Sequence, residues 1–278
     1  MNDLASIIES NVVAALAEDI GSGDRTALLI AATADADASV ICRSDAVVCG
    51  APWFDACFRK LEPESEIHWL VSEGDKVSPG QKLCGVRASS RVLLTAERTA
   101  LNFLQLLSAV ATTTRRYVDA AAGTRAKIVD TRKTIPGLRI AEKYAVRVGG
   151  GFNHRIGLYD AILIKENHIM AAGGIGAALG AAERIATPGI WLEIEVENLD
   201  QLREALAAGA KMIMLDNMSL DQMREAVRIA AGRAELEASG GITLDTVRAV
   251  AETGVDRISI GSLTKDIRAI DLSMRFDS

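Results

Sequence analysis

Six short apolar segments that alternate with helical stretches constrain the fold of this 278-residue chain more than any other feature. They lie at Lys127–Val129, Ala161–Ile164, Leu192–Val196, Met212–Leu215, Ala234–Leu236 and Arg257–Ile260. Strands that recur at this spacing, with helices between most of them, indicate a parallel sheet. The alternation therefore predicts either a (β/α) barrel or an open, doubly wound sheet.

Polar and small residues at the strand ends decide between these two folds. The strands are closed or followed, in chain order, by Asp130, Arg132 and Lys133, by Lys165, by Glu195, by Asp216, by Ser239, Gly240 and Gly241, and by Gly261 and Ser262. A barrel gathers the ends of all its strands around one axis, whereas an open sheet concentrates function at one switch point. We therefore expect an α/β barrel with its functional face at the carboxyl ends of the strands.

The segment from Asp130 to His168 holds an unusual density of cations. It has seven Lys and Arg residues against four Asp and Glu residues, in a chain whose net charge is −6. It also contains His154 and His168, two of the three histidines of the chain. A local positive excess in an acidic protein suits small anionic substrates, because nucleic acid usually needs a broad basic face. The alternative is solvated surface charge, but apolar strands flank the segment.

The composition excludes several other classes of protein. No stretch approaches the ~18 uninterrupted apolar residues of a membrane span, and the start of the chain lacks the pattern of a signal peptide. We therefore expect a cytosolic protein. The four cysteines show neither CxxC spacing nor a nearby histidine, so we expect packing residues at Cys42, Cys49, Cys57 and Cys84.

The first third of the chain predicts a separate, smaller domain. Apolar residues at helical spacing predict a helix over the first ~20 residues. Short apolar runs from Ala38 to Arg91 predict a small sheet, with a helix from Pro52 to Lys60 and a hairpin at EGDKVSPGQKL. A long helical region from Leu93 to Ala122 follows and marks the domain junction.

Two turns after the last two strands have the composition of phosphate-binding loops. They are SGGIT at Ser239–Thr243 and SIGS at Ser259–Ser262. Backbone N–H groups and the helix dipole favour phosphate at such turns, and barrels frequently bind phosphate at this pair of loops. The alternative is that both are ordinary structural turns.

Two carboxylates at neighbouring strand ends, Glu195 and Asp216, could hold ribose hydroxyls or Mg²⁺ with its waters. A carboxylate at a strand end is equally often an ion-pair residue. Glu193 and Glu197 share the strand face of Glu195. Periodicity alone therefore does not choose among these three glutamates.

The motifs of the chain also form a recognisable series: ERTALNFLQLLS, DTRKTIPGLR, KYAVRVGGGFNHRIGLYDAILIKENHI, EVEN, IMLDN, SGGI and SIGSLTK. In this order they resemble the quinolinate phosphoribosyltransferase family, also called nicotinate-nucleotide pyrophosphorylase (carboxylating). The likeness spans essentially the whole chain.

The resemblance implies an N-terminal α/β sandwich domain, an incomplete (β/α) barrel and a homodimer with shared active sites. We expect the sandwich over residues 1–110, the barrel over residues 111–265, and residues 266–278 packed back on the sandwich. The implied reaction converts quinolinate and phosphoribosyl pyrophosphate to nicotinate mononucleotide, pyrophosphate and CO₂, with Mg²⁺, in the de novo synthesis of NAD.

The resemblance also implies roles for individual residues. Arg98 would reach into the partner's site, and Thr131, Arg132, Lys133, His154, Arg155 and Lys165 would surround the carboxylates and phosphates. Glu195 and Asp216 would face the ribose and the metal, the latter through water, and they would join Lys133 and Lys165 as catalytic residues. The 5′-phosphate would lie against Ser239, Gly240, Gly241, Ile260, Gly261 and Ser262.

One departure from the family pattern is Lys265, which stands where many relatives carry histidine. Its role in phosphate binding stays open. Two alternatives also remain: a molybdenum-transport-associated relative with the same fold, and a catalytically silent binding homologue. The first should alter the ERT and DTRKTIPGLR motifs, and the second should lack some of the charged residues, but all are present.

Overall fold

We describe the protein from a computed structural model, which covers residues 3–31 and 34–277. The chain forms two compact units. The first contains the residues up to Arg115, Thr134–Gly150 and the residues from Asp266, and the second contains Arg116–Lys133 and Gly151–Lys265. None of the described helices is both long enough and apolar enough to cross a membrane.

The first unit is built on an antiparallel sheet with the strand order β12-β1-β5-β3. Its strands are β1 (Asp35–Cys42), β3 (Glu66–Trp69), β5 (Lys82–Ser89) and β12 (Leu272–Phe276). Two further short strands, β2 (Ala46–Val47) and β4 (Lys76–Val77), pair with each other. The helices are α1 (Leu4–Ile20), the 3-10 helix η1 (Ala27–Leu29), α2 (Ala51–Leu61), α3 (Ser90–Ala120) and α4 (Arg139–Val148).

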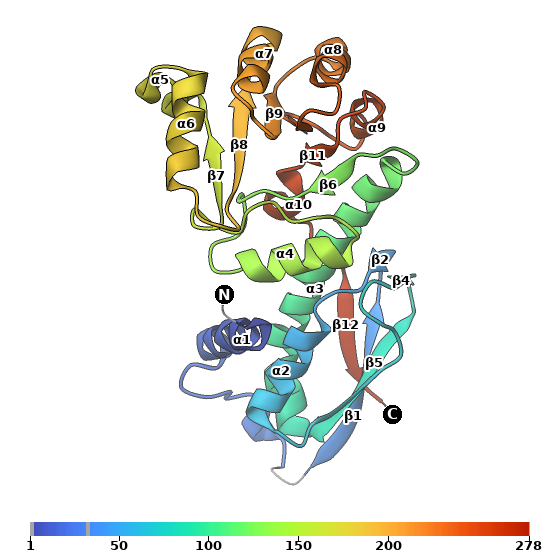
Figure 1. Cartoon of the computed structure of the whole chain (residues 1–278). Coiled ribbons are helices and arrows are strands. Elements are labelled where there is room, and N and C mark those ends of the chain that lie inside the picture. Colours follow the sequence, from blue (N-terminus) through green and yellow to red (C-terminus); the bar gives the residue numbers. More distant parts are fainter. Residues whose placement is uncertain (1–2, 32–33, 278) are drawn as a thin grey trace. The chain divides into compact units, whose positions relative to one another are not determined.

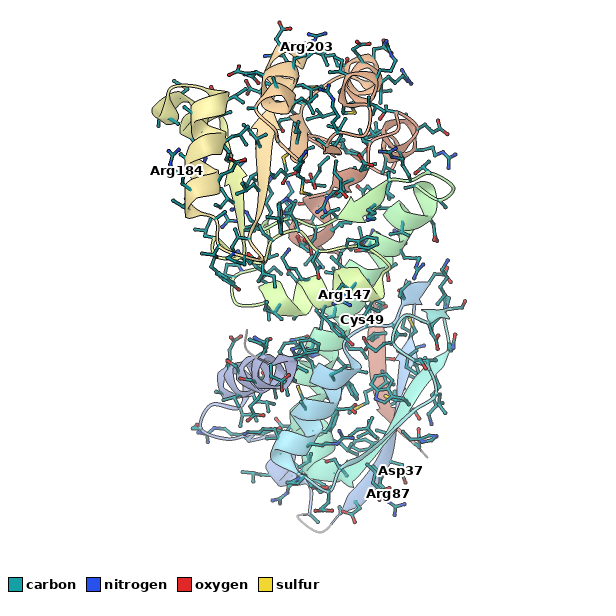
Figure 2. The ribbon with its side chains drawn as sticks, in the orientation of Figure 1. Asp37, Cys49, Arg87, Arg147, Arg184 and Arg203 are labelled. Atoms are coloured by element: carbon teal, nitrogen blue, oxygen red, sulfur yellow. The ribbon has the colours of Figure 1, made fainter. Side chains whose placement is uncertain are left out.

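Alternation along the strands separates the core of this sheet from its solvent face. Val40 and Val86 are buried, whereas Asp37 and Arg87 are exposed. Asp37 and Arg87 are directly opposite each other in the register of β1 and β5, and Figure 2 shows them together near one end of the sheet. Opposite charges at such positions favour the pairing of two strands.

The prediction of a hairpin at EGDKVSPGQKL is wrong, because its two strands, β4 and β5, do not pair with each other. β4 pairs with β2, and β5 pairs with β1 on one side and with β3 on the other. Both edges of β5 are therefore occupied, so no hydrogen-bonding edge is left for β4. The segment between β4 and β5 connects two different sheets.

The second unit is a parallel sheet of six strands (Figure 1). They are β6 (Lys127–Val129), β7 (Ala161–Ile164), β8 (Trp191–Val196), β9 (Met212–Asp216), β10 (Glu235–Ser239) and β11 (Arg257–Ser259). The order is β6-β11-β10-β9-β8-β7, so the first strand has joined the last, as in a barrel. β6 and β7 remain edge strands in the described part of the chain, which confirms the incomplete (β/α) barrel.

Helices connect most of these strands and cover the outside of the sheet (Figure 1). They are α5 (Glu166–Ala172), α6 (Ile175–Ile185), α7 (Leu199–Ala207), α8 (Leu220–Ala230), α9 (Val247–Ala251) and α10 (Ser262–Lys265). Two of these helices are N-capped by side chains. Asn198 accepts hydrogen bonds from the first turn of α7, and Ser219 forms a capping box with Gln222 at α8. These two helices begin within four residues of the ends of β8 and β9, close to the site residues Glu195 and Asp216.

The two units do not follow the predicted limits of residues 1–110 and 111–265. Residue 110 lies inside α3, and residues 134–150 group with the first unit. The physical reason is the packing of α4, because Tyr144 lies against Trp53 with ring centroids 5.3 Å apart and donates a hydrogen bond to Glu73. The described residues from Asp266 to Asp277 also group with the first unit, where β12 pairs with β1.

Candidate active site

A pocket of about 350 Å³ opens at the carboxyl ends of the barrel strands. Every strand of the second unit contributes to it, directly or through the residues that follow. It is lined by Thr131, Arg132, Lys133, His154, Arg155, Leu163, Lys165, Glu195, Met214, Asp216, Glu237, Ser239 and Ser259. Nine of these thirteen are residues that we expected in the site, so the strand ends converge as predicted.

Lys165 and Glu195 form an ion pair at the ends of β7 and β8. The distance from Lys165 Nζ to Glu195 Oε2 is 2.7 Å. Lys165 is also the N-cap residue of α5, where its backbone N–H donates to Nδ1 of His168. That hydrogen bond holds the strand end against the first turn of the helix, so the position of Lys165 is set locally on both sides.

Asp216 lies on the same side of the pocket, at the end of β9. Burial and the neighbouring carboxylate of Glu195 raise the pKa of Asp216 above its usual value. Asn217 Nδ2 donates to Asp216 Oδ2 at 2.8 Å and opposes this rise. A carboxylate whose pKa is raised by a neighbouring carboxylate lies in a favourable environment for a cation, so Asp216 and its neighbour Glu195 are the residues that could hold a metal ion.

The segment after β6 supplies cations from another side of the pocket. Thr131 Oγ1 accepts the backbone N–H of Lys133 at 3.1 Å, and the Lys133 carbonyl accepts from Thr264 Oγ1 at 2.7 Å. These bonds fix the backbone that carries Arg132 and Lys133. Both side chains line the pocket, where they can meet carboxylate or phosphate groups.

The loop that carries Arg155 fills the gap between the edge strands β6 and β7. Phe152 forms a bridge with Val129 of β6. The buried carboxylate of Asp130 accepts hydrogen bonds from Asn153 Nδ2 and from the His154 backbone N–H. At the far end of the loop, Asp160 accepts the backbone N–H groups of Ile156 and Gly157. Two carboxylates therefore fix the backbone on either side of Arg155.

Arg155 itself is held in a partly buried position. Its Nη1 donates to the carbonyl of Ala161 at 3.3 Å. Burial and, after it, the positive charge of Arg132 lower the pKa of Arg155. Two guanidinium groups held close to one another indicate a site built for an anion, because an anion between them would relieve their repulsion.

A buried polar cluster occupies the barrel interior beneath these cations. His154 Nε2 lies 2.9 Å from Glu193 Oε2 and 3.8 Å from Glu237 Oε1, and Arg257 Nε donates to Glu237 Oε2 at 2.9 Å. Both glutamates are fully buried. Burial raises the pKa of Glu193 to about 7 and, together with the charge of Glu193, raises that of Glu237 to about 7.

The two glycine-containing loops after β10 and β11 leave backbone donors open. Among the described residues, the N–H groups of Gly240, Gly241 and Gly261 have no backbone acceptor. Gly240 has a φ of +103°, and a Cβ there would collide with the side chain of Asn217. Only glycine therefore fits at this position. These loops can offer N–H groups to a phosphate.

Ile260 differs from its neighbours in this loop. Its backbone N–H donates to the Val129 carbonyl at 2.9 Å, and its side chain is buried. The loop after β11 can therefore present an N–H group at Gly261 or Ser262, but the N–H of Ile260 is already used by the sheet.

The remaining predicted residues lie outside the pocket lining. They are Arg98, Gly240, Gly241, Ile260, Gly261 and Ser262. Arg98 lies on α3 in the first unit and is exposed. Ser262 begins α10, and its hydroxyl lies 3.4 Å from that of Tyr117. Lys265 is exposed at the last residue of α10.

The sequence analysis missed three pocket residues, Leu163, Met214 and Glu237, and it included a fourth, Ser259, only as the first residue of the SIGS loop. Each lies two residues before a strand end that the analysis did select. Because alternate residues of a strand face the same side, these four face the pocket one layer deeper. The same rule places Glu193 below Glu195, whereas Glu197 lies past the end of β8 and is exposed. Strand periodicity, extended inward from each strand end, would have found them.

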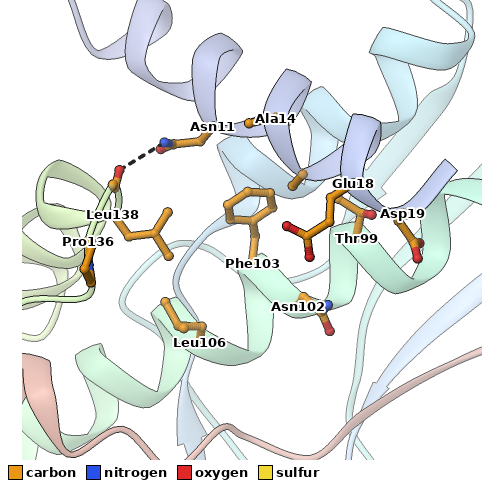
Figure 3. A pocket seen from close by; sticks show the side chains of 12 residues that line it. Asn11, Ala14, Glu18, Asp19, Thr99, Asn102, Phe103, Leu106, Pro136 and Leu138 are labelled. Atoms are coloured by element: carbon orange, nitrogen blue, oxygen red, sulfur yellow. Dashed lines mark hydrogen bonds between the residues drawn. The ribbon is translucent and has the colours of Figure 1, made fainter. Parts of the chain in front are cut away.

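A second cavity, of about 410 Å³, lies in the first unit between α1, α3 and the segment before α4 (Figure 3). Phe103 and Leu106 of α3 and Leu138 line it, and Asn11 Nδ2 donates to the Gly137 carbonyl at 3.3 Å. Its two acidic residues, Glu18 and Asp19, make it a poor site for the anions that suit the barrel pocket.

Comparison with known proteins places both units in one family. The model of the N-terminal domain of quinolinate phosphoribosyl transferase matches residues 23–108, and that of its C-terminal domain matches residues 110–275. The chain is 42% identical over 257 residues to a probable nicotinate-nucleotide pyrophosphorylase [carboxylating] of Bacillus subtilis, which covers 92% of this chain and 89% of that protein.

Solved structures agree with the sequence relatives. The structure of nicotinate-nucleotide pyrophosphorylase from Francisella tularensis superposes with a TM-score of 0.96 at 46% identity, covering 99% of this chain and 98% of that one. NadC from Streptococcus pyogenes superposes with a TM-score of 0.95 at 39% identity, covering 100% of both chains. With an incomplete barrel, a pocket of cations and carboxylates at its strand ends and relatives along its full length, this chain belongs to the quinolinate phosphoribosyltransferase family.

Proposed function

We propose that this chain transfers the phosphoribosyl group of phosphoribosyl pyrophosphate to quinolinate, with loss of CO₂, to give nicotinate mononucleotide and pyrophosphate in the de novo synthesis of NAD. One observation carries the proposal: the barrel pocket brings the cations Arg132, Lys133, Arg155 and Lys165 together with the carboxylates of Glu195 and Asp216. Quinolinate is a dianion and the ribose donor carries three phosphates, so a site for both needs several cations.

The proposed roles follow from the positions of these groups. Arg132, Lys133, Arg155 and Lys165, with Thr131 and His154 beside them, bind the carboxylates of quinolinate and the phosphates of the donor. Arginine suits a planar carboxylate, because its guanidinium group can donate two parallel hydrogen bonds. The loops at Ser239–Gly241 and at Gly261–Ser262 bind the 5′-phosphate through backbone N–H groups. Ile260 holds the second loop against the sheet but donates no hydrogen bond to the phosphate, because its N–H is bound to Val129.

The reaction begins with a displacement at C1 of the ribose. The ring nitrogen of quinolinate attacks this carbon, the bond to pyrophosphate breaks, and positive charge develops on the ribose in the transition state. The carboxylates of Glu195 and Asp216 are placed to stabilise that charge. No nucleophile with an adjacent base lines the pocket, so a direct displacement fits better than a covalent enzyme intermediate.

Loss of CO₂ then follows from the new charge on the ring nitrogen. The C–C bond to the adjacent carboxylate breaks, its electron pair stays on the ring carbon beside the cationic nitrogen, and that carbon takes up a proton. Lys133 and Lys165 are the proposed catalytic cations, because they can balance the charge of the quinolinate carboxylates and the charge that develops on the leaving pyrophosphate.

Mg²⁺ fits the donor set of the pocket, because Glu195 and Asp216 offer the carboxylate oxygens that this ion prefers, directly or through water. When bound, Mg²⁺ would neutralise charge on the pyrophosphate. We further propose a cytoplasmic homodimer with shared active sites, in which Arg98 serves the site of the partner subunit.

The decisive experiment measures release of CO₂ from carboxyl-labelled quinolinate. We expect release only when both phosphoribosyl pyrophosphate and Mg²⁺ are present. Release that does not depend on the ribose donor would point to a different reaction. Absence of release under all conditions, with a folded protein, would support the silent homologue instead.

A further inference from the structure

A buried cluster joins His154 to three residues that have no part in the reaction described above: Glu193, Glu237 and Arg257. It lies beneath the cations of the pocket, and it is linked to them through one residue. The backbone N–H of Arg155 donates to Nδ1 of His154 at 2.8 Å. The ring of His154 is therefore a direct support for the residue that we assign to the substrate carboxylates.

That hydrogen bond defines the state of the imidazole ring. A nitrogen that accepts a backbone N–H carries no proton of its own, so Nδ1 is unprotonated. The proton of the neutral ring must then lie on Nε2, which points to Glu193 Oε2 at 2.9 Å. Nε2 is the donor in this bond and the glutamate is the acceptor.

Three further contacts surround the ring of His154 and the neighbouring carboxylate of Glu237. Trp191 packs edge-on against the His154 ring, with centroids 5.0 Å apart. Glu237 Oε1 lies 3.8 Å from Nε2, and Arg257 Nε binds the other oxygen of Glu237 at 2.9 Å. The side chains of His154, Glu193 and Glu237 are at most 6% exposed, so water does not compete for these bonds.

We propose that Glu193, supported by Glu237 and Arg257, is a positioning residue that holds His154 as its Nε2–H tautomer and through it fixes the backbone of Arg155 at the pocket. The assignment to quinolinate binding rests on the proposed function. The geometry of the network does not. If Glu193 no longer accepts from Nε2, the ring can turn over or exchange its tautomer, and Arg155 loses the acceptor that orients its backbone.

A divalent cation is the competing occupant of this cluster, because one ligand atom from each of His154, Glu193 and Glu237 lies within 4.8 Å of the others. A metal would need the lone pair of Nε2, and the ring proton would then have to move to Nδ1. The Arg155 N–H already occupies Nδ1, so the hydrogen bonds favour the proton network over a metal site.

The first experiment reads the tautomer directly. The chain has three histidines, so the side-chain ¹⁵N spectrum of the histidine-labelled protein is simple, and His154→Asn assigns the signals. We expect a neutral Nε2–H ring in the wild type and a changed ring signal in Glu193→Leu. An Nδ1–H or cationic ring, or an unchanged signal in Glu193→Leu, would overturn the proposal. So would one equivalent of tightly bound divalent metal in the purified protein that is lost in Glu193→Gln.

The second experiment links the network to substrate. Glu193→Gln keeps an acceptor oxygen and should change the KM for quinolinate by less than about threefold. Glu193→Leu removes the acceptor and should raise that KM by about tenfold, the effect of one lost hydrogen bond to a charged group, with the KM for the ribose donor unchanged. Glu235→Gln, at the exposed start of β10, is the control and should match the wild type.

The outcomes separate the two proposals. If the wild type does not consume quinolinate, the proposed function fails while the spectrum still tests the network. If the wild type is active and Glu193→Leu leaves the KM for quinolinate unchanged, only the positioning role fails. Should Glu193→Leu not fold, the ring spectrum of the wild type still decides the tautomer, and equal rises of both KM values in Glu193→Gln would indicate a general structural role.

Discussion

Lys165 Nζ lies 2.7 Å from Glu195 Oε2, and this ion pair joins the ends of the adjacent strands β7 and β8. The Lys165 side chain is 50% exposed and that of Glu195 is 15% exposed. Ion pairs with one partner this open to solvent contribute little to folding stability. The pair is better understood as a pre-arranged part of the pocket, in which the carboxylate orients the ammonium group toward an anionic substrate.

Removal of the ammonium group should therefore affect activity more than stability. We expect Lys165→Ala to lower kcat/KM by about 100-fold or more, the usual effect of losing one preorganised electrostatic group. The melting temperature should stay close to that of the wild type. Arg203→Ala is a matched control, because it removes an exposed ion pair, also of 2.7 Å, on the outer helix α7 (Figure 2). Similar losses of activity in both variants would contradict the assignment.

Lys133→Ala and Arg155→Ala should each weaken quinolinate binding more than they weaken the fold. Each removes a cation that lines the pocket, and a charge-assisted hydrogen bond is worth about 1.5–3 kcal/mol. Titration calorimetry gives the binding change, and thermal unfolding gives the change in stability. Parallel losses of affinity and of stability would show that these two residues are structural.

Gly261→Ala should reduce affinity for the ribose donor. The φ of Gly261 is outside the left-handed region, and an added Cβ would lie 3.2 Å from Cδ of the flexible Lys133 side chain, so the fold can accept it. The methyl group would stand where phosphate approaches the backbone N–H, at a cost of about 1–3 kcal/mol. Gly176→Ala, in an open position on α6, is the control. Gly240→Val is a poorer test, because its Cβ would collide with Asn217 and disturb the loop itself.

The proposed homodimer with shared sites can be tested by mixing two inactive variants. If Arg98 serves the partner's site, a mixed dimer of Arg98→Ala and Lys165→Ala contains one site with both defects and one intact site. After random subunit exchange, half of the dimers are mixed and half of their sites are intact, so about a quarter of wild-type activity should return. Exchange without recovery would place Arg98 in its own subunit's site or outside any site.

Glu142 should make the stability of the wild type depend on pH. Burial raises its pKa from 4.5 to about 7, against the opposing effects of the Ile135 N–H and of Arg139. The folded state therefore binds the proton more tightly than the unfolded state, and the free energy of unfolding falls as the pH rises from about 4.5 to about 7.

We expect Glu142→Gln to flatten this dependence, because glutamine does not titrate. Compared with the wild type, the variant should gain stability as the pH is raised from about 5 to about 8 in urea unfolding experiments. The exposed residue Glu64 supplies the control variant Glu64→Gln, which should follow the wild-type curve. A constant difference between Glu142→Gln and the wild type at all pH values would contradict the prediction.

Much of the barrel could be predicted because its signals are local. Each of the six strands lies within three residues of its predicted limits, and Lys165, Glu195, Asp216 and Ser239 line the pocket as expected. A strand is recognised from neighbouring residues, and the residue after its carboxyl end is placed by chain connectivity. The long helix predicted from Leu93 to Ala122 likewise corresponds to α3, Ser90–Ala120.

The features that escaped prediction depend on residues far apart in the sequence. The Ile260 N–H donates to Val129, and Tyr144 lies against Trp53 and bonds to Glu73. These contacts join segments that no local pattern connects. The pairing of β4 with β2 in place of β5 has the same origin. Each depends on which edges and faces are already occupied in the folded protein.

The amino-acid sequence by itself determined the alternation of strands and helices, the strand-end residues and the family, because periodicity and motif order are properties of the linear chain. Only the tertiary structure decided which of three glutamates on β8 and just beyond it has which role: Glu195 lines the pocket, Glu193 is buried against His154, and Glu197 is exposed. The physical reason is that depth along a barrel is set by the register between neighbouring strands, and a period of two residues does not specify that register.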